Sequence, residues 1–338
     1  MLGNILDIFA NDAFGCVSLT QGINDTSMFP IDLGRVGKMG LFEESGIQTD
    51  TVVIETDGNS LSLVPNTPVG APPNYVGRDK RKVRSFLVPN LPQEGQILAS
   101  EVQNVRAFGS TQLQAVQEVV NKRAKSMVTR LDATIEYHRV GALKGIVLDS
   151  DGSTTLFNLF TEFGVSQDTV DFVLGTSSTE MLKKCFAVSR LIEDALGAGS
   201  GFSGVKALCG ETFWERFTTH AVVKDAFAFY QANRKSEDLR KSGFEFGGIT
   251  FYEYRATVNS IDFIADSECH FFPVGSPGLF QTVYAPAAWM ETVNTTGLPR
   301  YMKQERMEFD RGIKLAVESR PFSFCTKPKC LVKGTTSN

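Results

Sequence analysis

The chain has 338 residues, 42% of them hydrophobic and 21% charged, which fits an ordinary folded protein and excludes wholesale disorder. Its formal net charge of -4 at pH 7 gives no general electrostatic reason to bind nucleic acid phosphates, so a dedicated DNA-binding protein is disfavoured. The length exceeds the roughly 100 to 200 residues of one ordinary domain and predicts two domains or one large domain with projections.

The N-terminal segment, as far as Glu44, carries Asn, Asp, Gly and Thr between isolated apolar residues. It shows neither a helical nor a strand period over any length, which predicts an extended arm. Phe14 and Phe29 are candidate anchors. We expect the arm to dock onto the body of its own chain or onto a neighbouring subunit.

A projecting hairpin is predicted next. The run from Thr51 to Glu55 is rich in β-branched residues, and the stretch 78–88 alternates as a second strand. Between them, the segment from Pro65 to Gly77 holds four prolines and two glycines and predicts a poorly packed tip. The second strand is strongly basic, with Arg78, Lys80, Arg81, Lys82 and Arg84.

The basic run has two interpretations. It binds phosphates, or it forms the solvated or intersubunit face of an exposed strand. No aromatic residues alternate with these cations as a base-stacking platform would require, so single-stranded nucleic acid is disfavoured. We favour a surface or interface role and take the five basic residues as candidate intersubunit contacts.

One long amphipathic helix is predicted from about Glu101 to Arg139. Its apolar stripe recurs at steps of three and four, through Leu113, Val116, Val120, Ala124, Met127, Leu131, Ile135 and His138. The opposite face is expected to meet water or other chains, through Gln114, Gln117, Lys122, Arg123, Lys125, Arg130, Asp132 and Glu136. His138 has no partner at metal-binding spacing and is predicted to pack at the helix end.

The remainder predicts mixed helices and strands. We expect a strand with a tight turn over 144–153, a further element over 168–172, helices over 178–197 and 211–230, and strands over 205–209 and 245–253. The glycine-rich loop 197–204 follows a helix and precedes a strand. Phosphate-binding loops need the opposite order, and the Lys-Ser/Thr pair of a P-loop is missing, so a nucleotide site is disfavoured.

No chemical signature marks an active site. The six cysteines are widely spaced, form no CxxC pair and have no His set beside them, so reduced thiols and no metal or other cofactor are expected. His220 and His270 lie far apart, outside any nucleophile signature. No apolar stretch approaches the roughly 18 residues that span a bilayer, and the N-terminus lacks the basic region and long apolar core of a signal peptide, so we expect cytosolic synthesis and no membrane association.

The order of arm, basic extended loop, spine-like helix and late α/β body resembles the lambda major head protein family of tailed-bacteriophage capsid proteins. The likeness covers nearly the whole chain. The residues that carry its C-terminal part are Cys269-His270-Phe271-Phe272-Pro273, Gly278-Leu279-Phe280, Leu298-Pro299-Arg300-Tyr301 and the run from Gly312 to Pro321. That last run resembles the family's closing segment, in which a strand ending in a small residue and Pro leads to a final short strand.

The resemblance implies an α+β, Hong Kong 97-like capsid fold with an N-arm, an extended β-hairpin loop, a long spine helix, and peripheral and axial domains. The implied division is 1–46 for the arm, 47–95 for the loop, 96–152 for the peripheral domain with the spine helix, 153–285 for a mainly axial part, and 286–338 for strands returning to the peripheral domain. The implied function is that of a non-catalytic late protein whose hexamers and pentamers form an icosahedral shell.

The shell would enclose phage double-stranded DNA without sequence-specific binding, in a virion assembled in the host cytoplasm. Implied partners are a separate scaffolding protein, since no scaffolding segment precedes the arm, a portal protein and a decoration protein. Lys80 and Lys82 lie in the element that crosslinks some relatives, but nothing marks a catalytic Glu, so noncovalent stabilisation is expected. Two alternatives stay open: an α/β hydrolase-like enzyme using Asp149, Asp151 or His220, and another virion structural protein such as a tail component.

Overall fold

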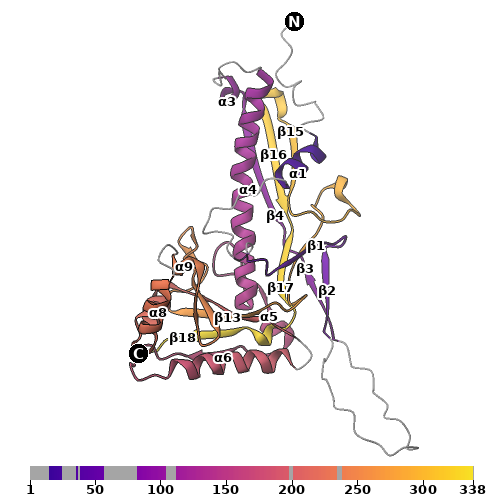
Figure 1. Cartoon of the computed structure of the whole chain (residues 1–338). Coiled ribbons are helices and arrows are strands. Elements are labelled where there is room, and N and C mark those ends of the chain that lie inside the picture. The colour runs from indigo at the N-terminus through magenta and orange to yellow at the C-terminus, as the bar shows by residue number, and fades with distance from the viewer. Residues whose placement is uncertain are drawn as a thin grey trace, which may run out of the picture.

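The computed structural model describes residues 15–24, 36, 39–56, 82–103, 112–197, 201–233 and 238–337. Figure 1 shows a long helix, α4 (Gln112–Lys144), running beside three strands, with a second α/β body at its lower end. The three strands form an antiparallel sheet in the order β15 (Tyr301–Arg306), β16 (Gly312–Ser319) and β4 (Leu91–Leu98). The fold is therefore α+β.

The apolar stripe of α4 packs on this sheet. Leu131 and Met127 lie in one core cluster with Ile97, Leu315 and Val317. The stripe prediction is confirmed for the described residues Val120, Ala124, Met127, Leu131, Ile135 and His138, which are all buried. The side chains of Leu113 and Val116 lie outside the described part of the chain.

The range of the predicted long helix is helical where the structure describes it. A short helix, α3 (Ala99–Gln103), and α4 (Gln112–Lys144) lie on either side of residues 104–111, which are outside the described part of the chain, and α4 continues past Arg139 to Lys144. The prediction for the polar face of this helix is wrong in part. Asp132 and Glu136, predicted to face water or other chains, are each only 1% exposed within this chain. The cause is tertiary, since other segments pack against this side of α4 and supply partners for both carboxylates.

The prediction of an irregular N-terminal arm is also wrong over part of its length, because Cys16–Asn24 form the helix α1. Thr20 Oγ1 accepts a hydrogen bond from the backbone N–H of Met302 at 3.1 Å, and Asn24 donates to the carbonyl of Arg300. Nine residues make only a marginal helix by themselves, so contacts with β15 stabilise α1. Phe14 and Phe29 lie outside the described residues.

The second body is built on a six-stranded mixed sheet. Its order is β7 (Asp168–Asp171), β18 (Val332–Thr335), β13 (Glu268–Val274), β8 (Gly204–Cys209), β10 (Ile249–Glu253) and β9 (Phe244–Phe246). Helices α6 (Met181–Leu196) and α7 (Glu211–Thr219) pack on it. A cluster of aromatic rings fills the core between them, including Phe172, Phe213, Phe217, Phe251 and Phe271.

Two elements predicted as continuous are divided. The predicted helix 211–230 breaks at His220 into α7 and α8 (Ala221–Asn233), and the His220 ring accepts a hydrogen bond from the N–H of Val222. The predicted strand 245–253 is the hairpin β9–β10, whose turn residues Gly247 and Gly248 have φ of 60° and 78°. Consecutive glycines adopt such angles without steric cost and favour a tight hairpin turn.

A third sheet and several short elements complete the fold. The sheet has the order β1 (Glu43–Gly46), β14 (Phe280–Tyr284) and β17 (Pro321–Cys325), and β1 lies parallel to β14. The short elements are β5 (Ile146–Leu148), β6 (Thr155–Asn158), α5 (Leu159–Phe163), α9 (Leu239–Ser242), β11 (Thr257–Val258), β12 (Ile261–Asp262), and the 3-10 turns η3 (Met290–Thr292), η4 (Glu308–Asp310) and η5 (Pro328–Cys330).

All six cysteines are free thiols, as predicted, and five of them are buried. Cys209 and Cys269 face each other across β8 and β13 with 3.1 Å between their sulfur atoms. Burial raises the pKa of the Cys269 thiol well above its usual value, which keeps it protonated and unreactive.

Candidate assembly surface

The predicted projecting hairpin is present as an antiparallel pair of strands, β2 (Thr51–Thr56) and β3 (Lys82–Leu87). Its inward face is apolar and fixed to the body. Phe86 packs against Phe157 and Phe322, with ring centroids 6.2 and 5.3 Å away. Val52, Ile54 and Val88 are buried on the same side. The hairpin base is therefore a rigid extension of the body.

The outward face of the hairpin is apolar as well, yet exposed. Val53, Val83 and Leu87 are 58%, 61% and 67% exposed, and the strand pairing places Thr51 and Ser85 among them. The register also places Glu55 opposite Val83, so the three apolar side chains alternate with polar positions on this face. Large apolar side chains gathered on one exposed face favour a contact site. The sequence prediction missed these three residues, although the strand alternation around Phe86 carried the signal.

The basic run is placed only in part. Arg78, Lys80 and Arg81 lie outside the described residues, and Lys82 pairs with Thr56 in the strand register. Arg84 points inward, where its Nε donates to the carbonyl of Glu162 at 2.7 Å and its guanidinium lies 4.5 Å from the ring centre of Phe163. Arg84 thus binds the hairpin to the C-terminal end of α5 within the same chain.

A row of polar contacts ties the segment before the hairpin to α4. Arg139, near the end of α4, lies 2.6 Å from the carboxylate of Glu44 in β1 and also donates to the hydroxyl of Tyr284. Burial raises the pKa of Tyr284, which stays neutral. Asp50, next to β2, pairs with Arg320 just before β17. These pairs fix the direction in which the hairpin leaves the body.

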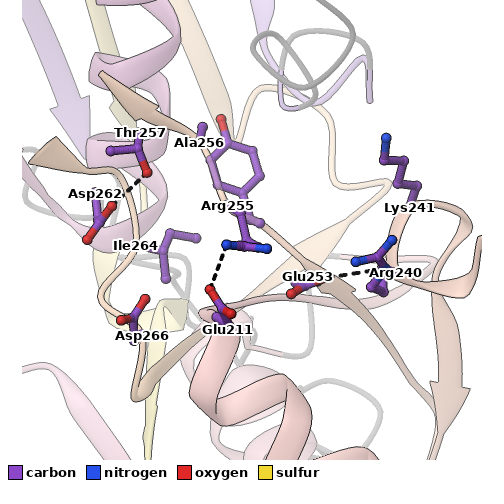
Figure 2. Close-up of a pocket in the computed structure, with 11 residues that line it drawn as sticks. Glu211, Arg240, Lys241, Glu253, Arg255, Ala256, Thr257, Asp262, Ile264 and Asp266 are labelled. Carbon is purple, nitrogen blue, oxygen red and sulfur yellow. Dashed lines mark hydrogen bonds and ion pairs between the residues drawn. The ribbon is translucent and has the colours of Figure 1, made fainter. Parts of the chain in front are cut away.

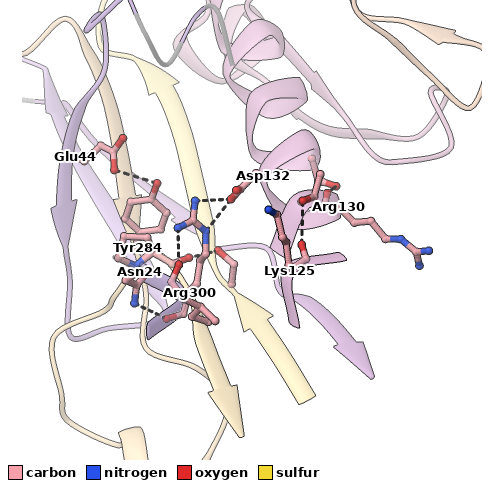
Figure 3. A network of polar contacts seen from close by, with 12 residues as sticks. Asn24, Glu44, Lys125, Arg130, Asp132, Tyr284 and Arg300 are labelled. Atoms are coloured by element: carbon pink, nitrogen blue, oxygen red, sulfur yellow. Dashed lines mark hydrogen bonds and ion pairs between the residues drawn. The ribbon is translucent and has the colours of Figure 1, made fainter. Parts of the chain in front are cut away.

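Asp132 and Glu136, which the sequence places on the polar face of the helix, also make polar contacts that join α4 to distant segments. Figure 3 shows Asp132 reaching Arg300 from one side of α4, while Arg130 extends from the other side. Glu136, one turn further on, accepts hydrogen bonds from the backbone N–H of Val36 at 2.8 Å and from the hydroxyl of Tyr254 at 3.0 Å. Sequence gave no signal for these partners, which are remote in the chain.

The residues of the enzyme alternative have local structural roles. Asp151 lies in a tight turn, where hydrogen bonds from the Thr154 hydroxyl and from the N–H groups of Ser153 and Thr154 lower the pKa of its carboxyl. The backbone carbonyl of Asp149 closes the same turn by accepting a hydrogen bond from the N–H of Gly152. His220 lies at the junction of α7 and α8, with its Nε2 3.0 Å from the carbonyl of Thr176.

A polar cavity of about 490 Å³ lies beside β10 and β11. Figure 2 shows two ion pairs along its wall: Arg255 pairs with Glu211 at 2.9 Å, and Arg240 lies 3.7 Å from Glu253. Within the described ranges, no cluster of three or more His, Cys, Asp or Glu side chains has metal-binding geometry. Within those same ranges, no helix is long and apolar enough to cross a membrane.

Comparison with known proteins gives a consistent result. The family described as Phage major capsid protein E matches residues 16–336. A major capsid protein of Pseudomonas phage KPP10 is 26% identical over 328 residues, which covers 91% of this chain and 93% of that protein.

Two solved structures, one of a putative capsid protein and one of a capsid, have similar folds. A putative capsid protein of an E. coli CFT073 prophage has a TM-score of 0.58 at 11% identity, covering 96% of this chain and 99% of its own. The capsid of cyanophage P-SCSP1u has a TM-score of 0.51 at 10% identity, covering 88% and 86%. At such low identity the likeness shows the fold alone.

Proposed function

Because the chain belongs to the phage major capsid protein E family and is a structural, non-enzymatic component of the virion shell, we propose that it assembles as hexamers and pentamers in which the outward face of the β2–β3 hairpin contacts a neighbouring copy. The observation that carries this proposal is the exposed apolar face of Val53, Val83 and Leu87 on a hairpin whose other face is buried. Burying such a face against a neighbouring subunit lowers the free energy and so favours assembly.

The rigid base of the hairpin supports an assembly role. Arg84, Asp50 and Phe86 each bind the hairpin to the body of its own subunit. An interface element held in its bound geometry loses little conformational freedom when a neighbour docks, which favours association. The basic residues Arg78, Lys80, Arg81 and Lys82 and the anchors Phe14 and Phe29 are proposed as further intersubunit contacts.

We divide the chain into an arm over 1–46, a loop that begins at residue 47 and ends where β4 starts at Leu91, a peripheral unit built on α4 with β4, β15 and β16, and an axial unit built on the six-stranded sheet. In this division β18 belongs to the axial unit, since it pairs with β13 and β7. The sequence expectation had placed all of 286–338 with the peripheral unit. Shell assembly in the host cytoplasm, with a scaffolding protein, a portal protein and a decoration protein around double-stranded DNA, completes the proposal.

Negative-stain electron microscopy of the purified protein, expressed with and without the neighbouring phage genes, tests this function. We expect closed shells, or rings of five and six subunits. Open tubes would favour a tail component instead. Small monodisperse particles under every condition would contradict the proposed self-assembly.

A further inference from the structure

The exposed side of α4 carries an excess of cations between residues 122 and 130, with exposed Glu118 one turn before Lys122. Lys122, Lys125 and Arg130 are all exposed, and among the residues that the structure describes no carboxylate pairs with them. Arg123, beside them, is instead balanced by Glu101 at 3.4 Å. Three cations with no carboxylate partner in the described part of the chain thus lie within about two and a half helical turns, in a protein of net charge -4. Such a row attracts a partner of negative charge.

A groove of about 560 Å³ continues this face toward the C-terminal end of α4. Ala133 and Tyr137 of α4 form one wall, and Val258, Ile261 and Phe263 form the other. The two walls meet at the bottom of the groove, where the ring centroids of Tyr137 and Phe263 lie 4.9 Å apart. Lys122, Lys125, Thr129, Ala133 and Tyr137 follow at steps of three and four, so the cations and the groove share one side of the helix.

From this continuity we propose that the exposed face of α4 and the adjoining groove bind an acidic amphipathic helix of a partner protein. Apolar side chains of that helix enter the groove between Tyr137 and Ile261, and its carboxylates lie over Lys122, Lys125 and Arg130. This inference rests on the proposed function, in which the shell protein is assembled with a separate scaffolding protein.

The combination of features favours protein over nucleic acid as the partner. A DNA duplex offers phosphates to the cations, but its backbone has nothing to fill an apolar groove. An amphipathic helix uses both surfaces, because anchors at i, i+3 and i+4 enter a groove while the flanking charges meet the rim. The row of cations and the apolar groove together therefore favour a helix with one acidic and one apolar side.

The probe that tests this proposal is a fluorescent synthetic helical peptide of about 20 residues, with Leu at i, i+3, i+4 and i+7 and Glu on the flanks. Fluorescence anisotropy against the unassembled full chain should show saturable binding that weakens as salt rises. A peptide with Lys in place of every Glu should fail to bind. A peptide of the same composition with its Leu residues scrambled should bind at least about tenfold more weakly.

Two variants and one control locate the contact. K122Q/K125Q/R130Q removes the cations and is expected to weaken binding about tenfold, as three partly screened ion pairs would. A133Q fills the groove without changing charge and should weaken binding to a similar degree. K184Q/R190Q/K224Q removes the same charge from α6 and α8 and should bind as the wild type does. Circular dichroism establishes that each variant is folded.

Equal loss of binding in the K184Q/R190Q/K224Q control would overturn the proposal, since only net charge would then matter. Binding of a 20-base-pair duplex that competes with the peptide and is insensitive to A133Q would assign the face to phosphates instead. If wild-type protein forms shells in the microscope but no peptide binds, the proposed function stands and this inference fails.

Discussion

Asp132 and Arg300 form a buried ion pair, with the carboxylate Oδ1 2.6 Å from Nη2 and 2.7 Å from Nε of the guanidinium. The same guanidinium donates to the carbonyl of Ile23 at 3.2 Å. One side chain thus joins α4, α1 and the start of β15. Burial raises the pKa of Asp132 in spite of the neighbouring positive charge, which shows how strongly the site is desolvated.

Removing one partner of this pair is expected to destabilise the fold strongly. R300M leaves the Asp132 carboxylate buried without a counterion, and D132L leaves the guanidinium in the same state, so each should lower the free energy of unfolding by about 3 to 5 kcal/mol. The double variant D132L/R300M should cost less than the sum of the two. Urea unfolding of all four proteins measures this coupling.

The exposed pair of Arg123 and Glu101, also on the α4 side, is the matched control. Because water screens it, R123M should cost less than about 1 kcal/mol. Additive costs of D132L and R300M would contradict a direct interaction between the two residues.

Replacing Leu87 by Asp should prevent assembly without unfolding the subunit. Leu87 is 67% exposed, so the change should alter the free energy of unfolding by less than about 0.5 kcal/mol. At an interface, the buried and unpaired carboxylate would be strongly unfavourable. Particle yield by sedimentation and subunit stability by urea unfolding are measured together. S85T, on the same face, should assemble normally, and normal shells from L87D would remove this face from the interface.

Two truncations distinguish the part of the arm that stabilises the subunit from the part proposed to act in assembly. Deleting residues 1–28 removes α1 with its contacts to Met302 and Arg300, so it should destabilise the subunit as well as its assemblies. Deleting residues 1–14 removes the candidate anchor Phe14 but leaves α1 in place. It should impair assembly alone. Unchanged shell yield and shell melting temperature after the shorter deletion would refute a docking role for that part of the arm.

His138 should make stability depend on pH between about 4 and 6.5. Burial lowers its pKa to about 4, against the opposing effect of Asp149, while the unfolded chain keeps the ordinary value of 6.5. In this window the unfolded state binds a proton that the folded state does not, so stability is complete above pH 6.5 and falls as the pH drops toward 4. The loss should reach about 3 kcal/mol at pH 4.

H138Q cannot take up this proton, so its stability should vary less with pH over that window, whatever its absolute value. Urea unfolding of both proteins at pH 4, 5, 6 and 7 makes the comparison. Parallel pH profiles would show that His138 is not the group responsible.

The local sequence pattern was sufficient to predict secondary-structure elements whose conformation is decided by neighbouring residues. The β-branched run at Thr51, the alternation around Phe86 and the stripe through Leu131 each predicted the correct element, because a strand or an amphipathic helix repeats its signal over many residues. The order of these elements also carried the resemblance to capsid proteins, which the family match then confirmed.

Tertiary structure alone decided the rest. Asp132 and Glu136 look like surface residues in the sequence, but Arg300, Tyr254 and Val36 reach them from distant segments and compensate their burial. α1 forms against β15, nearly 300 residues further along the chain. Contacts over such separations leave no periodic trace in either segment. The sequence therefore determined the elements and their order, while long-range packing decided which polar groups are buried and which apolar face remains open for a neighbour.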